Sequence, residues 1–211
     1  MAILTTNNKL MKYNKIVFWL NIISSIIFLV LVCIAHYFAI LNGYDWQNLE
    51  LSELVLDSFT SKILFSIACV LEGFCLILLL IPLSLYFRPK KIQLTALVFS
   101  LFVCISLIGV GAFPEDIFLV THYIFGVSFF VFTAFFICFI TIVLQKYEKT
   151  FPKSIIIFGF STFAVVIFHI STRWFFGMAY SQRLAVLLSM IYMLVLSGRI
   201  IYSVKINETV P

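Results

Sequence analysis

The sequence predicts an all-α fold, a polytopic membrane bundle of six transmembrane helices. Three observations predict it: an apolar composition, six long apolar runs, and basic residues gathered on one side of those runs. Of the 211 residues, 63% are hydrophobic and 11% are charged, against roughly 45–50% and 25% in ordinary soluble domains. The mean hydropathy is +1.15. These values indicate an integral membrane protein and exclude a typical water-soluble domain.

Six apolar runs are each long enough to cross a membrane. A helix needs roughly 20 apolar residues to span a hydrocarbon core of about 30 Å. The runs are too long and too continuously apolar for the alternating strands of a barrel, so we expect helices. We place them at residues 16–41, 62–86, 92–113, 117–144, 154–172 and 184–204. We expect them to form one domain over residues 1–211, since no internal repeat or soluble segment interrupts them.

The loops between these helices differ in charge. Lysine and arginine favour the cytoplasmic side of a membrane. Most of them fall on one predicted side, at residues 9–15, 88–91, 146–153 and 199–205, whereas acidic residues fall on the other side, at 45–57 and 115–116. We therefore expect both termini in the cytoplasm of a cell-membrane protein. The net charge of +5 is then a topology signal, and we expect no nucleic-acid partner.

Residues 109–122 (GVGAFPEDIFLVTH) place polar groups between apolar runs. Pro114, Glu115 and Asp116 suit the start of a helix, because the missing proline N–H needs no partner there and acidic groups favour the positive end of the helix dipole. His122 lies roughly 9 Å further along the helix at 1.5 Å per residue. Ionisable groups at membrane depth are costly and indicate a functional site.

Other ionisable residues lie on the same predicted outer side. His169 and Arg173 are four residues apart, so their side chains share one helix face. Glu72 lies near the middle of its helix, roughly 15 Å deep. We therefore expect a polar pocket that is open to the outside, lined by His36, Glu72, Glu115, Asp116, His122, His169, Arg173 and Arg183.

The residue types suggest roles in this pocket. Histidine and carboxylate groups move protons, so the candidate catalytic residues are His122, Asp116 and His169. Arginine binds anionic groups such as phosphate in a bidentate manner. The candidate ligand-binding residues are Arg173, Arg183, His36, Glu115 and Glu72. Each also has a structural interpretation, as a hydrogen-bonded packing residue or an interfacial anchor.

Enzyme motifs are missing from this pattern. Neither the G-x-S-x-G elbow of serine hydrolases nor the H-E-x-x-H helix of zinc proteases occurs, and no nucleophile is identified. We therefore predict no cofactor and no metal, although zinc chemistry would become plausible if the three histidines converged. Whether the protein is an enzyme stays open.

Two segments carry a resemblance to a known family: G-x-G-x-F-P-E-D at residues 109–116 with His122 after it, and GMAYSQR at residues 177–183. With these motifs the chain resembles the prokaryotic six-helix membrane family called domain of unknown function 998, over nearly its whole length. The layout is also distantly similar to Frag/DRAM/Sfk-type membrane proteins. The resemblance implies the six-helix topology and highlights Pro114, Asp116, His122 and Arg183.

Three functions are compatible with these observations. The first is binding of an anionic or lipidic ligand in the outward pocket, with lipid head-group chemistry as a possible activity. The second is a non-catalytic scaffold or sensor, whose polar residues tie helices together. The third is a small proton-coupled transporter that uses Glu72 as its titrating group. Membrane lipids are the expected partners, with a membrane protein or a second copy of the chain as further candidates.

Overall fold

A computed structural model gives the fold and describes residues 8–45, 49–85, 87, 89–149, 151–176 and 179–203. Seven helices occur in these ranges, and six of them are long and apolar enough to cross a membrane. The helices are α1 (Asn8–Leu41), α2 (Leu54–Asp57), α3 (Phe59–Ser84), α4 (Lys90–Ala112), α5 (Glu115–Tyr147), α6 (Lys153–Phe176) and α7 (Ala179–Ser203). The predicted fold class, an all-α bundle with six membrane-spanning helices, is confirmed.

Several helix ends differ from the predicted ones. Helix α1 begins at Asn8, eight residues before the apolar run, although its span suited to a membrane begins at Lys15. Helix α7 begins at Ala179 and not near residue 184. Both extensions consist of polar and mixed sequence, so hydropathy alone does not mark them. The short helix α2 was not predicted.

Prolines mark three of the helix starts. Pro89 and Pro114 are the N-cap residues of α4 and α5, and Pro152 directly precedes α6. Proline suits these positions because it has no backbone N–H to leave unpaired. We predicted Pro114 at the first helical position, but it lies one residue earlier, with an extended ψ of 141°. Glu115 and Asp116 then form the first turn of α5, as predicted.

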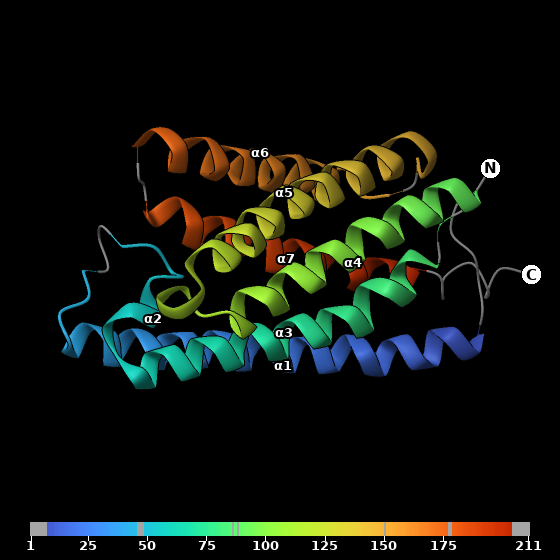
Figure 1. Cartoon of the computed structure of the whole chain (residues 1–211). Helices are drawn as coiled ribbons and strands as arrows, with labels where there is room; N and C mark the ends of the chain where they lie inside the picture. The colour runs from blue at the N-terminus through green and yellow to red at the C-terminus, as the bar shows by residue number, and fades with distance from the viewer. Residues whose placement is uncertain are drawn as a thin grey trace, which may run out of the picture.

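The six long helices form a closed ring. Each packs against the next along the chain, and α7 returns to contact α1. Figure 1 shows α5 crossing the bundle diagonally, so that it diverges from α6 towards the end where α5 begins. Helix α6 packs against both α5 and α7. Side chains of α1, α3, α4, α5 and α7 line the space inside this ring.

The two ends of the bundle differ in charge. One end carries α2, the start of α5 and the start of α7, with Glu50, Glu53, Glu115 and Asp116; we call it the acidic end. Helix α1 begins and α7 finishes at the opposite end, which we call the basic end (Figure 1). The ends of the described chain therefore lie on one side. That this side is cytoplasmic stays a prediction.

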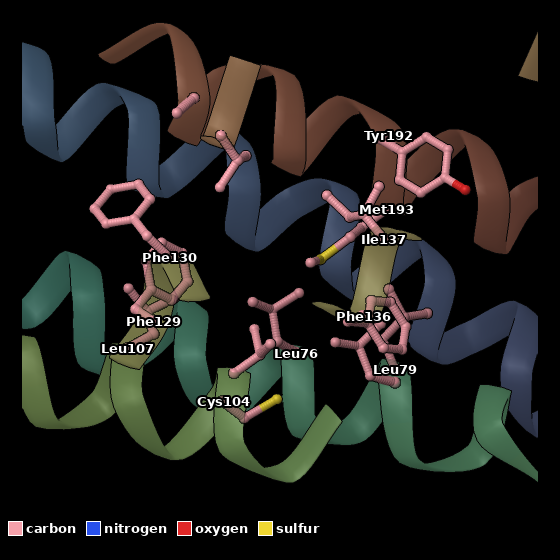
Figure 2. Packing of buried hydrophobic residues seen from close by; sticks show 14 of the residues in the cluster. Leu76, Leu79, Cys104, Leu107, Phe129, Phe130, Phe136, Ile137, Tyr192 and Met193 are labelled. Atoms are coloured by element: carbon pink, nitrogen blue, oxygen red, sulfur yellow. The ribbon is translucent and has the colours of Figure 1, made fainter. Parts of the chain in front are cut away.

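Small residues allow close packing between α3 and α4. A Cβ added to Gly111 would lie 2.6 Å from the backbone oxygen of Ser66, so only glycine fits there. Further along, apolar side chains of α3, α4, α5 and α7 fill the middle of the bundle (Figure 2). They include Leu76, Leu107, Phe129 and Met193. These side chains form the walls around the candidate site.

Candidate functional site

A cavity of about 60 Å³ lies inside the ring of helices. It extends from Ser52 and Gln182 at the acidic end to Leu79 and Leu194 deeper in the bundle. Most of its surface is apolar, from residues such as Phe28, Phe65, Leu76, Leu107, Phe129 and Met190. Its polar residues are Ser25, Ser52, Glu72, His122, Tyr123, Gln182 and Ser189. Two of the predicted site residues, Glu72 and His122, therefore share one cavity.

Glu72 is the most deeply placed ionisable group of the cavity. It lies thirteen residues beyond Phe59, the first residue of α3, or roughly 20 Å at 1.5 Å per residue. Its side chain is 2% exposed. The hydroxyl of Ser24 donates to Oε2 at 2.6 Å, and that of Ser25 donates to Oε1 at 2.9 Å. Two adjacent residues of α1 thus fix both carboxylate oxygens.

His122 is held by the turn that starts α5. Its Nδ1 lies 2.8 Å from the carbonyl oxygen of Phe113. Because a carbonyl only accepts, Nδ1 carries the proton in this bond, and in the neutral ring Nε2 is an acceptor. Nε2 lies 3.7 Å from Oε2 of Glu115, which is 8% exposed. Glu115 therefore lies beside His122 at the start of α5, a neighbour that was not predicted from the sequence.

Gln182 closes the cavity at the acidic end. Its Oε1 accepts a hydrogen bond of 2.5 Å from the backbone N–H of Leu51, and its Nε2 donates to Glu50 Oε2 at 3.3 Å. Both partners belong to the loop that precedes α2. Gln182 is 5% exposed. This one side chain thus fastens the loop to the start of α7 and forms part of the cavity lining.

Arg183 lies beside the cavity and points elsewhere. Its Nη2 donates to the hydroxyl of Tyr44 at 2.7 Å and to the carbonyl oxygen of Leu49 at 2.9 Å. Its Nε and Nη1 atoms are buried and have no hydrogen-bond partner among the described residues. His36 is close by, with its ring 5.6 Å from that of Tyr44, and its Nδ1 lies 3.1 Å from the carbonyl oxygen of Val32. Arg183 and His36 therefore form a second cluster, outside the cavity lining.

His169 and Asp116 lie outside the cavity lining. His169 is 1% exposed, and its Nδ1 lies 2.9 Å from the hydroxyl of Ser181, so it ties α6 to α7. Asp116 lies at the surface of the acidic end, 2.5 Å from Nζ of Lys62. The side chain of Arg173 lies outside the described residues. The other seven residues that were predicted to line one pocket thus lie at several places in the bundle.

The three histidines do not share a metal-binding arrangement. Within the described part of the chain, no three His, Cys, Asp or Glu side chains are grouped closely enough to hold a metal ion. His122 lines the cavity, His36 faces Tyr44 and His169 faces Ser181. The zinc chemistry that convergence of the histidines would have favoured gains no support.

Several side chains that form the site were not identified from the sequence. Ser24, Ser25, Gln182 and Ser189 all help to form the site, yet uncharged polar residues are common in membrane helices. The adjacent pair at positions 24 and 25 was the best available signal, because it interrupts a long apolar run near its middle. Gly126 was also missed: it lines the cavity, and an added Cβ would meet nothing within 4 Å.

The chain matches a known protein family. A family model described as protein of unknown function (DUF998) matches residues 22–199. No curated protein and no solved structure matches the chain. The matched range includes the cavity lining, from Ser25 to Leu194. Similarity to Frag/DRAM/Sfk-type proteins stays a prediction. With a match over most of its length and six membrane-spanning helices, the chain belongs to the DUF998 family.

Proposed function

We propose that this multi-pass protein resides in the cell membrane and binds one slender amphipathic molecule in the cavity inside its ring of helices. The apolar part of the molecule lies among the side chains of α3, α4, α5 and α7. Its polar part lies near Glu72 and His122. The observation that carries the proposal is the cavity itself, which combines apolar walls with a buried carboxylate at membrane depth. Such a carboxylate is costly and is retained where it has a function.

The size of the cavity limits what it holds. A buried water needs about 10–15 Å³ of such space, so a cavity of about 60 Å³ has room for a few waters or for one narrow chain. A phospholipid with two acyl chains does not fit inside it. A single alkyl chain or a similarly thin lipidic molecule does, and it gains from contact with the apolar walls.

The ligand has a route from the surrounding lipid. Tyr123 lines the cavity and is also 43% exposed on the outer surface of the bundle. Gly126, one turn further along α5, contributes no side chain to fill the space. Helix α5 diverges from α6 towards the acidic end (Figure 1). These features favour entry between α5 and its neighbours, in the half of the membrane nearer the acidic end.

The anionic ligand considered from the sequence has less support. Arg183 is not part of the cavity lining, and its Nη2 donates to Tyr44 and Leu49. The hydrogen bond between His169 and Ser181 likewise ties helices together. Such ties favour the scaffold interpretation for these particular residues. Binding of an anion by Arg173 and Arg183 stays a prediction.

A second candidate is a proton-coupled carrier, favoured by the position of Glu72 in mid-membrane at the cavity surface. The described cavity ends at Leu79 and Leu194, so a carrier needs a second conformation open to the basic end. Proton uptake by proteoliposomes that is lost in Glu72→Gln would support this function. Equal uptake by the parent protein and by empty liposomes would contradict it.

Two substitutions at Gly126 test the ligand-binding proposal. Gly126→Leu places a side chain in the cavity, whereas Gly126→Ala changes the same backbone position and adds one methyl group in open space. We expect native mass spectrometry of the gently purified protein to show a bound amphiphile in the parent and in Gly126→Ala, and little in Gly126→Leu. An adduct retained equally by Gly126→Leu, or none in any of the three proteins, would contradict the proposal.

A further inference from the structure

The charged side chains that line the cavity are not balanced in sign. Glu72 is the only carboxylate among the residues that line it, and no lysine or arginine of the described chain does so. Resting on the ligand site proposed above, we infer that the polar group of the ligand is a protonated amine, which Glu72 binds inside the membrane. The ligand class is then a slender cationic amphiphile rather than a fatty acid or a phosphate ester.

The geometry of Glu72 leaves room for this contact. Ser24 and Ser25 donate one hydrogen bond to each carboxylate oxygen, and both come from α1. A carboxylate offers about four acceptor positions, so each oxygen retains one. Because Glu72 also lines the cavity, an ammonium group there completes its hydrogen bonding. The two serines hold the carboxylate in a fixed orientation for that group.

The described chain supplies no cation of its own to Glu72. Lys62 pairs with Asp116 at the surface of the acidic end. Arg183 lies outside the cavity lining and donates to Tyr44. Buried charges in proteins are normally paired, because an unpaired one loses its hydration without compensation. Without a cation beside it, a buried carboxyl group is uncharged instead, so a protonated amine supplies the positive charge that keeps Glu72 ionised.

Ser189 offers a second contact for an amine. It lies on α7 and lines the same cavity. It is 3% exposed, and its hydroxyl oxygen is buried without a hydrogen-bond partner in the described part of the chain. An ammonium group has three donors, so one ligand group has hydrogen bonds for both Glu72 and Ser189. An unpartnered hydroxyl in an otherwise apolar wall is therefore an independent indication of a polar ligand.

Three probes with the same alkyl chain test the inference: octylamine, octanol and octanoate. Their dissociation constants are measured by native mass spectrometry at neutral pH, for the full chain reconstituted in nanodiscs of uncharged lipid. We expect octylamine to bind at least about tenfold more tightly than octanol, because charge-assisted hydrogen bonds are roughly twice as strong as neutral ones. Octanoate should bind most weakly. Similar affinities for the three probes would overturn the inference.

Substitutions of Glu72 and Ser189 test whether these residues cause the preference for the amine. In Glu72→Gln, the preference for octylamine over octanol should fall below about twofold. In Ser189→Ala, octylamine should bind a few times more weakly, as expected for loss of one hydrogen bond. A preference that persists in Glu72→Gln would overturn the inference. If that variant does not fold, the order of the three dissociation constants on the parent protein still tests the inference.

The Gly126 variants separate this inference from the proposed function. Gly126→Leu should weaken all three probes, and Gly126→Ala should weaken none, because the leucine fills the cavity whatever the head group. If Gly126→Leu weakens all three probes but the parent shows no preference for the amine, the inference is contradicted and the proposed function is not. If Gly126→Leu leaves probe binding unchanged, the cavity is not the ligand site.

Discussion

Ser24 of α1 and Glu72 of α3 meet near the middle of the bundle, where the serine hydroxyl donates to Oε2 across 2.6 Å. Ser25 makes the matching bond to Oε1 at 2.9 Å. Helices α1 and α3 are otherwise joined largely through apolar contacts. The pair of serines thus stabilises the helix contact and positions the one carboxylate of the cavity.

Replacing both serines by alanine should lower the free energy of unfolding. Hydrogen bonds to charged groups contribute roughly 1.5–3 kcal/mol each in soluble proteins, whereas interhelical bonds in membranes average about 0.6 kcal/mol. We expect a loss of about 2 kcal/mol for Ser24→Ala with Ser25→Ala, since a buried carboxylate is left without donors. Circular dichroism during titration with a denaturing detergent measures it.

Ser171→Ala is the matched control for this loss. Ser171 is an exposed serine on α6 whose hydroxyl bonds the carbonyl oxygen of Ile167 in its own helix. We expect its replacement to change the free energy of unfolding by less than about 0.5 kcal/mol. Equal losses in the control and in the double variant would show that the contacts to Glu72 add nothing to stability.

Two glycines should respond differently to alanine. Gly111→Ala brings a Cβ to 2.6 Å from the backbone oxygen of Ser66, which cannot move without shifting α3. Overpacking of this kind costs roughly 1–3 kcal/mol. Gly126→Ala meets nothing within 4 Å, so we expect no loss, or a small gain from better helix propensity. Thermal unfolding of both variants checks this, and a stable Gly111→Ala protein would contradict the packing of α4 on α3.

Arg183 and Tyr44 should be energetically coupled. The guanidinium donates to the tyrosine hydroxyl at 2.7 Å, so a double-mutant cycle of Arg183→Lys and Tyr44→Phe should give a coupling energy of about 1 kcal/mol in thermal or chemical unfolding. Tyr192→Phe serves as the control partner, because Tyr192 bonds Thr141 and not Arg183. Its effect should add to that of Arg183→Lys within about 0.5 kcal/mol. A coupling energy between Arg183 and Tyr44 that is no larger than the one between Arg183 and Tyr192 would contradict the hydrogen bond.

The fold was largely predictable from the sequence. Six apolar runs determine six membrane helices, since no other structure satisfies the backbone in lipid. The ends of α1 and α7 were not predictable from hydropathy, because helices continue into polar sequence. Helix α2 was missed because only four residues form it, which is too short for a periodic pattern.

The site was predictable only in part. Depth along a helix identified Glu72 and His122, and both line the cavity. Depth does not determine the direction in which a side chain points, so Arg183 and His169 were grouped with them although they bond Tyr44 and Ser181. Direction depends on how each helix is rotated within the ring. That rotation is set by packing contacts such as Gly111 against Ser66, which a single sequence does not specify.

The orientation in the membrane is testable by labelling. In a variant without the native cysteines, Glu53→Cys places a thiol at the acidic end and Lys149→Cys places one in the exposed loop at the basic end. Since lysine-rich loops favour the cytoplasm, a membrane-impermeant maleimide should label the first in intact cells and the second only after permeabilisation. The reverse pattern would invert the topology and place the acidic end inside.

Photo-cross-linking tests the central proposal, binding inside the ring of helices, most directly. An octylamine derivative with a diazirine on its chain is added to the protein in nanodiscs, irradiated, and mapped by peptide mass spectrometry. We expect labels on residues 122–130 of α5 and 186–194 of α7, which include the cavity walls, and loss of these labels in Gly126→Leu but not in Gly126→Ala. Labels confined to the exposed outer faces of the helices, and equal in all three proteins, would contradict binding in the cavity.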